Sequence, residues 1–167
     1  MNAESKDLLR DQAALQIDEN GNLRHLLTLE GLDKRLLLDI LDDAETYLTE
    51  PGSLPAHNRA LAGRTVANLF FEPSTRTRAS FDLAGKRLGA DVLNLDVNTS
   101  SRKKGECILY TIYTLEAMQA YIMVVRDASA GVPAYIARHV KPHVSILNAG
   151  ESDVSHPTQG LLDMLTI

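Results

Sequence analysis

Four short apolar runs define the secondary structure predicted for the second two-thirds of the chain. They are rich in Val, Leu and Ile and too short for free-standing helices, as is typical of buried strands; they lie at residues 65–71, 90–95, 121–125 and 143–148. Between them apolar side chains recur at helical spacing, which predicts helices at about 75–88, 105–118 and 132–140. The same spacing predicts an earlier helix over 32–49, ended by Pro51-Gly52.

Strands that alternate with helices at this spacing form right-handed βαβ units, so we expect an α/β fold with a parallel sheet. In such sheets, ligands bind beyond the carboxyl ends of the strands. The dense polar clusters in the second half of the chain each follow a predicted strand; they lie at 74–78, 98–106, 126–127 and 156–159. The sequence therefore predicts one site along one edge of the sheet.

The densest cluster is Phe71-Glu72-Pro73-Ser74-Thr75-Arg76-Thr77-Arg78, between a predicted strand and a predicted helix. Ser74 or Thr75 can cap that helix, whose N-terminal N–H groups carry partial positive charge. Arginine matches phosphate or carboxylate oxygens with two parallel hydrogen bonds. This combination predicts an oxyanion site, with phosphate as the favoured ligand. The alternative is a capped helix with solvated arginines.

The other clusters each allow a functional and a structural interpretation. The loop at 98–106 offers hydroxyls, cations and a glycine, or it is simply an exposed basic loop. Arg126 follows an apolar run, so its partly buried stem calls for an anionic partner, either a ligand or an internal carboxylate such as Asp127. A neutral His156 could donate to a carbonyl oxygen, or it could cap the helix that follows.

Composition limits the class of protein. The chain has 167 residues, 44% of them hydrophobic, and a net charge of −5, which suits one domain and argues against nucleic-acid binding. The residues of 74–104 are net basic, as a small anionic ligand would require. No apolar run is long enough to span a membrane, and the first residues do not form a secretory signal, so we expect a cytoplasmic protein. Cys107 is the single cysteine, too few for a disulfide or a structural zinc site.

Neither a metal-ligand spacing, nor a Walker loop, nor a nucleophile elbow is present in the sequence. The site is therefore one of hydrogen-bond donors and cations. Chemistry of that kind works by positioning the reactants and stabilising developing negative charge.

With these motifs in view, the chain resembles the carbamoyltransferases, and aspartate carbamoyltransferase in particular. The resemblance rests on the motif at 71–78 with Ser80-Phe81 after it, on the Ser-to-Glu loop at 100–106, and on His156-Pro157-Thr158-Gln159. Ornithine carbamoyltransferase shares Ser-Thr-Arg-Thr-Arg but usually has Cys where Thr158 stands, and it lacks the Glu-Pro pair that stands here at Glu72-Pro73. The resemblance implies one of the two domains of that fold, a four-stranded parallel sheet in the order 2-1-3-4 with helices on both faces.

The resemblance also implies roles for individual residues in binding carbamoyl phosphate and in catalysis. The catalytic residues would be Arg76, Thr77, Lys104, Arg126 and His156. The phosphate would be held by Ser74, Thr75, Arg76 and Thr77. The carbamoyl carbonyl oxygen would be contacted by Thr77, Arg126 and His156, and the carbamoyl amino group by Gln159. Ser100 and Lys104 would reach the site of a neighbouring subunit, because the family is built on trimers. No cofactor or metal is implied, and the reaction would give N-carbamoyl-aspartate for pyrimidine synthesis.

Two departures from the family pattern matter. Asp127 stands where the family usually has His, and a carboxylate there could weaken the pull of Arg126 on the substrate. The family chain is also about twice as long. We therefore expect a flexible polar extension at 1–22, a carbamoyl-phosphate domain at 23–155 and the start of an interdomain helix at 156–167. L-aspartate would bind only if a second domain were supplied, so the chain alone would be inactive. A non-catalytic paralogue with a role in assembly, or another carbamoyltransferase, remains an alternative.

Overall fold

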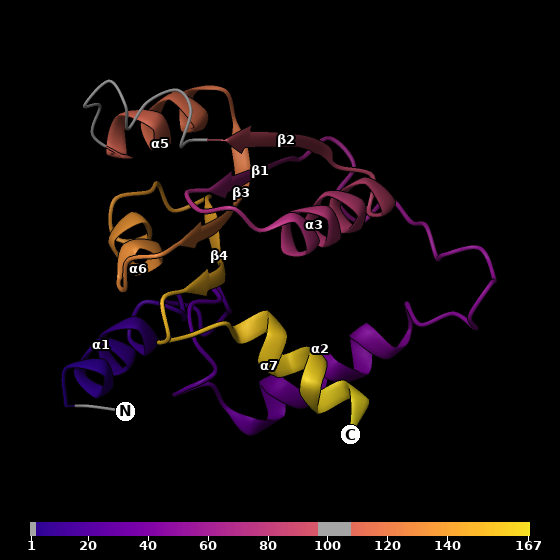
Figure 1. Ribbon diagram of the computed structural model, residues 1–167, viewed down its shortest axis with the longest axis horizontal. Helices are drawn as coiled ribbons and strands as arrows, with labels where there is room; N and C mark the ends of the chain where they lie inside the picture. The colour runs from indigo at the N-terminus through magenta and orange to yellow at the C-terminus, as the bar shows by residue number, and fades with distance from the viewer. Residues whose placement is uncertain (1–2, 97–107) are drawn as a thin grey trace.

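A single parallel sheet forms the centre of the molecule. The computed structural model describes residues 3–96 and 108–167. Its strands are β1 (Thr65–Phe70), β2 (Asp91–Asp96), β3 (Ala120–Asp127) and β4 (Ser145–Glu151), all parallel and in the order β2-β1-β3-β4 (Figure 1). The α/β fold and the strand order 2-1-3-4 expected from the sequence are confirmed.

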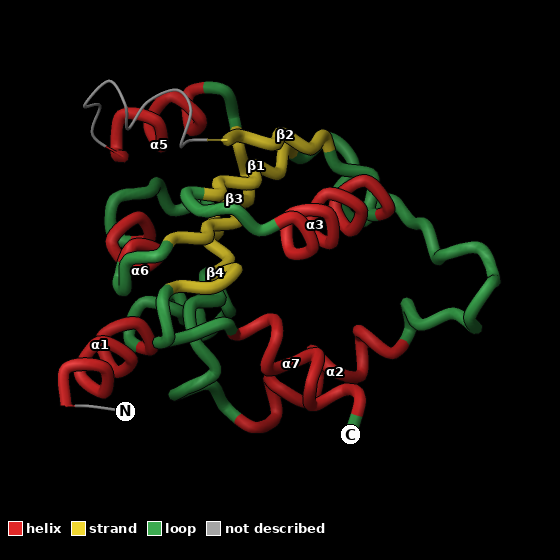
Figure 2. The backbone as a smooth tube through the Cα atoms, in the orientation of Figure 1, coloured by secondary structure: helices red, strands yellow, loops and turns green. Residues whose placement is uncertain are grey.

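Helices cover both faces of the sheet. On one face lie α5 (Ile108–Ala117) and α6 (Val132–Ala137), and on the other lies α3 (Thr75–Arg87). Next to the β4 edge, α7 (Pro157–Thr166) runs beside α2 (Lys34–Glu45) (Figure 1). Figure 2 shows the connection from α2 to β1 as a long loop outside the sheet. No helix in the described ranges is long and apolar enough to cross a membrane.

Most side chains of β1, β3 and β4 are apolar because both faces of these strands are largely buried, although Asn68 and Asn148 are buried there as well. In β1, Ala67 and Leu69 face the larger core together with α5 and α6, and Val66 and Phe70 face the smaller core beneath α3. Side chains along a strand alternate between faces, so one run supplies both cores. This two-sided packing fixes where each strand ends, and with it the edge that carries the polar clusters.

The prediction of a flexible extension at 1–22 is wrong for most of that segment. Residues Ala3–Ala13 form helix α1, in which Leu9 is buried. Gln12 and Gln16 are fully buried as well, and Gln16 Oε1 accepts hydrogen bonds from the backbone N–H groups of residues 27 and 28 at 2.7 and 2.9 Å. The segment is thus packed onto the domain through polar side chains, which an apolar pattern does not reveal.

Candidate anion-binding site

Helix α3, from its first turn onward, forms one wall of a cavity of about 480 Å³. Ser74 stands at the N-cap of α3, and its hydroxyl makes no capping hydrogen bond. The first-turn N–H groups of α3 therefore keep their ability to bind an anion, and the adjacent Arg76 and Thr77 line the cavity. The Ser74 hydroxyl therefore does not cap α3, as the alternative interpretation of the motif would require.

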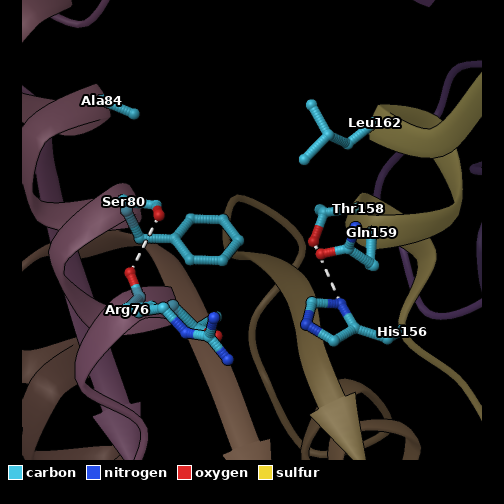
Figure 3. A pocket seen from close by; sticks show the side chains of 9 residues that line it. Arg76, Ser80, Ala84, His156, Thr158, Gln159 and Leu162 are labelled. Atoms are coloured by element: carbon cyan, nitrogen blue, oxygen red, sulfur yellow. Dashed lines mark hydrogen bonds between the residues drawn. The ribbon is translucent and has the colours of Figure 1, made fainter. Parts of the chain in front are cut away.

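The opposite wall is the N-terminal end of α7 (Figure 3). His156 is the N-cap residue of this helix, and it too makes no side-chain capping bond. Its Nδ1 lies 3.3 Å from Thr158 Oγ1, and Gln159 Nε2 donates to Asp163 Oδ1 at 2.8 Å. Figure 3 shows Arg76 and His156 facing each other across the cavity. The complete lining consists of Arg76, Thr77, Ser80, Phe81, Ala84, His156, Thr158, Gln159 and Leu162.

Arg126 lies next to this cavity, at the end of β3. With Gly150 and His156 it lines an adjoining hollow of about 280 Å³. Its Nη1 donates to the carbonyl oxygen of Ala149 at 2.9 Å, and its Nε is 2.6 Å from Glu72 Oε1. Among the described residues, however, no acceptor lies in line with the Nε–H bond. We therefore treat the contact with Glu72 as an ion pair rather than a directed hydrogen bond.

Glu72 is a carboxylate partner of Arg126 that the sequence did not single out. Asp127, which the sequence suggested for that role, is fully buried, and its Oδ1 accepts a hydrogen bond from the backbone N–H of Ser129 at 2.8 Å. Asp127 thus stabilises the turn after β3. The sequence signal for Glu72 was its place in the motif at 71–78, directly after β1.

Gly150 is a second feature that the sequence did not reveal. Its φ is +113°, and a Cβ built on it would lie 2.2 Å from Arg126 Nη1 and 3.1 Å from His156 Cδ2. Only glycine allows both side chains to lie this close to the β4 backbone. Gly150 therefore sets the positions of Arg126 and His156 together.

The surroundings of His156 favour its neutral form. Burial lowers the pKa of the imidazole below its ordinary value, and the charge of Arg126 lowers it further, while Asp163 opposes the shift. If Thr158 donates its hydroxyl proton to Nδ1, the imidazole proton is on Nε2. A neutral His156 with that tautomer is a hydrogen-bond donor toward the cavity.

The structure brings most of the predicted site residues together. Arg76, Thr77, His156 and Gln159 share the larger cavity, and Arg126 adjoins it through His156. Ser74 and Thr75 form the start of α3 beside them. Ser100 and Lys104 lie outside the described residues. Two arginines, hydroxyl groups and two helix N-termini converge here. The chain is thus an α/β domain with a candidate anion site at the carboxyl edge of its sheet.

Comparison with known proteins gives the family. Residues 24–167 match the family model described as aspartate/ornithine carbamoyltransferase, carbamoyl-P binding domain, and the chain belongs to this family. It is similar to the catalytic subunit of M. jannaschii aspartate transcarbamoylase, with 38% identity and a TM-score of 0.74 over 87% of this chain and 46% of that one.

Two further solved structures are similar to the chain. One is aspartate transcarbamoylase from Trypanosoma cruzi in complex with N-(phosphonacetyl)-L-aspartic acid, with 35% identity and a TM-score of 0.75 over 86% of this chain and 44% of that one. The other is ornithine carbamoyltransferase from Thermus thermophilus, with 30% identity and a TM-score of 0.76 over 87% and 48%. The chain thus spans less than half the length of these relatives, and both acceptor specificities occur among them.

Proposed function

We propose that the chain binds carbamoyl phosphate as the first domain of an aspartate carbamoyltransferase. The observation that carries the proposal is the cavity in which Arg76 and Thr77 from α3 face His156 and Gln159 from α7, with Arg126 beside them. Its donors suit a small, doubly charged ligand with a phosphate at one end and an amide-like group at the other.

The phosphate would occupy the N-terminal end of α3. There the first-turn N–H groups and the hydroxyls of Ser74, Thr75 and Thr77 are available as donors, and Arg76 supplies charge. The carbamoyl group would then point toward α7. Gln159 Nε2 is engaged by Asp163, which leaves the amide oxygen of Gln159 to accept from the carbamoyl amino group.

The carbonyl oxygen of the ligand would lie against Thr77, Arg126 and His156. In the reaction the amine of an amino acid attacks the carbamoyl carbon and the C–O bond to phosphate breaks. The leaving phosphate takes the electron pair of that bond and the proton that the amine loses. Negative charge builds up on the carbonyl oxygen during the attack. The Arg126 guanidinium and a neutral His156 donating through Nε2 would stabilise that charge, which is a strong effect in a water-poor site.

Calorimetric titration of the chain with carbamoyl phosphate and with inorganic phosphate tests the binding proposal. We expect weak binding of both, and an Arg76→Ala variant with at least about tenfold lower affinity, because it removes a charge-assisted contact. Lys86→Ala is the matched control: Lys86 lies on the same helix but pairs with Asp82 and does not line the cavity. A flat trace for the unsubstituted chain, or equal affinities for it and Arg76→Ala, would reject the proposal.

The acceptor amino acid is the second part of the proposal. Thr158 and the Glu72-Pro73 pair before the motif favour aspartate, whereas the similarity to an ornithine carbamoyltransferase keeps ornithine as the alternative. Assays of a longer form that contains the second half of the family chain, with each amino acid in turn, distinguish the two. We place the whole enzyme in the cytoplasm as a homotrimer or larger assembly, in which Ser100 and Lys104 would complete a neighbour's site.

A non-catalytic paralogue is the second candidate, favoured by Asp127 at the position after Arg126. It would keep the fold and assemble with a longer, active chain. Co-purification with such a chain, together with a flat carbamoyl phosphate titration, would support this candidate over the enzyme.

A further inference from the structure

A buried polar cluster connects the N-terminal helix to the wall of the candidate site. Gln12 Nε2 donates to Glu151 Oε1 at 2.5 Å, and Asn148 Nδ2 donates to the same oxygen at 2.9 Å. The backbone N–H of Gly131 donates to Glu151 Oε2 at 2.6 Å. Gln12, Asn148 and Glu151 are each at most 1% exposed. Buried carboxylates are rare and costly unless their oxygens are satisfied, so each of these donors matters.

Glu151 lies directly after the residues that hold Arg126 and His156. The carbonyl of Ala149 accepts from Arg126, and Gly150 contacts both Arg126 and His156. Asn148 Oδ1 in turn accepts from the N–H of Gly150 at 2.9 Å. The end of β4 thus meets Arg126 and His156 at Ala149 and Gly150, and the buried polar cluster at Asn148 and Glu151. The Asn148 side chain links Glu151 to Gly150, because its Nδ2 donates to the Glu151 carboxylate and its Oδ1 accepts from the N–H of Gly150.

Helix α1 is seated so that Gln12 reaches Glu151. The Cβ that Gly131 lacks would lie 3.4 Å from Leu8 Cδ1, and the Cβ that Gly31 lacks would lie 2.8 Å from that of Ala13. The ion pair that Asp11 forms with Arg138, at the end of α6, is exposed and contributes little to this seating. Contacts on either side of Gln12 therefore fix the helix, and Gln12 transmits its position to β4.

We propose that Gln12 and Glu151 are positioning residues: through them, α1 holds the end of β4 so that Arg126 and His156 face the anion. The inference rests on the proposed function, because the bound anion is the one proposed above. Neither residue touches that ligand. Burial raises the pKa of Glu151 above its ordinary value, and the donors from Gly131, Gln12 and Asn148 oppose this shift. Removing one donor therefore destabilises the charged form of Glu151, the residue of the cluster whose burial is least favourable.

The test compares three variants of the full chain, Gln12→Leu, Gln12→Asn and Asp11→Ala. Gln12→Leu removes the donor while keeping much of the volume, and Gln12→Asn withdraws the amide by one methylene and serves if the first variant does not fold. Asp11→Ala is the matched control, since it breaks the exposed ion pair of α1 and leaves Gln12 in place. Phosphate affinity is measured by calorimetry at a temperature where thermal melts show the proteins folded.

We expect Gln12→Leu to bind phosphate about tenfold more weakly, an effect comparable to the loss of outer hydrogen-bond partners at metal sites. Gln12→Asn should lose less, and Asp11→Ala should stay within about twofold. A second readout is the NMR titration of His156. Because Arg126 lowers the pKa of His156, displacement of Arg126 should raise that pKa in Gln12→Leu and leave it unchanged in Asp11→Ala.

Unchanged phosphate affinity together with an unchanged His156 titration in the Gln12 variants would overturn the inference. If the unsubstituted chain binds neither phosphate nor carbamoyl phosphate, the proposed function fails, and the His156 titration alone then decides whether Gln12 positions the site. Equal losses in Gln12→Leu and Asp11→Ala would also overturn it, because they would indicate general loosening of α1.

Discussion

At the scale of single residues, Gly150 is the position where the smallest change should have the largest effect on the site. An alanine Cβ there would overlap Arg126 Nη1, and the φ of +113° would be strained for any side chain. We expect Gly150→Ala to lose phosphate binding by about tenfold or more, because Arg126 must move from Ala149 and His156. Calorimetry with inorganic phosphate measures the loss.

Gly21→Ala is the control that distinguishes the effect of backbone strain from the effect of the steric clash with Arg126. Gly21 has a φ of +82°, but a Cβ there would meet nothing within 4 Å. This variant should lose about 1–2 kcal/mol of unfolding free energy and keep its phosphate affinity. If Gly150→Ala binds phosphate as well as Gly21→Ala does, Gly150 does not set the position of Arg126.

His25 should make the folded state sensitive to acid. It is 2% exposed, its Nδ1 accepts from the backbone N–H of Ile146 at 3.0 Å, and burial, with help from Arg24, lowers its pKa from 6.5 to about 4. The unfolded chain therefore binds a proton between these values while the folded chain does not. Stability should fall as the pH drops from 6.5 to about 4, by on the order of 3 kcal/mol for this group.

Urea unfolding of the chain and of His25→Gln at several pH values measures this contribution. A glutamine can accept the same backbone hydrogen bond without titrating, so the variant should lose less stability over the same acid range. Glu151 acts in the opposite direction, because its raised pKa makes stability fall as the pH rises above 4.5. Both proteins contain Glu151, so its contribution cancels when their unfolding free energies are subtracted. Parallel pH profiles for the two proteins would contradict the assignment to His25.

At the scale of elements, those that bury apolar side chains could be predicted from the sequence, and those that bury polar side chains could not. The strands were predicted to within a few residues because both faces of β1, β3 and β4 are apolar. The order of the N-terminal segment, helix α1 and the residues after it, was missed because the side chains it buries include Gln12 and Gln16 beside Leu9. A polar face satisfied by specific hydrogen bonds has no apolar period, so no pattern of hydrophobic residues could have revealed it.

Gln16 is the residue through which this packing can be tested. Its Oε1 satisfies two buried backbone N–H groups, those of residues 27 and 28. Gln16→Leu would leave both groups without this acceptor, and we expect a loss of about 2–4 kcal/mol of unfolding free energy in urea. Glu19→Leu, at an exposed position in the turn that follows, should change it by less than about 0.5 kcal/mol. A loss in Gln16→Leu no larger than that control would show that the hydrogen bonds of Gln16 contribute little to stability.

At the scale of the whole molecule, the candidate site depends on residues far apart in sequence. The motif at 71–78 and His156 could be predicted, because strand ends of a parallel sheet meet at one edge. The pairing of Glu72 with Arg126 and the close approach at Gly150 could not, because they follow from the register between β1, β3 and β4. The fold and the sheet edge that carries the site could thus be predicted from the sequence, whereas the contacts that orient Arg126 could not.

A ligand in the cavity should join the two helices that form its walls. Within α7 only Pro157 and Leu161 are buried. Few packing contacts therefore oppose local unfolding of this helix, and its amides should exchange readily in the absence of ligand. We expect carbamoyl phosphate to slow amide hydrogen exchange at residues 74–81 and 156–162 together and to leave α2 unchanged. In Arg76→Ala, the protection should be lost from both segments, although the substitution lies on α3 alone. Protection confined to 74–81 would mean that the ligand does not reach His156 and Gln159, and that α7 is not a wall of the site.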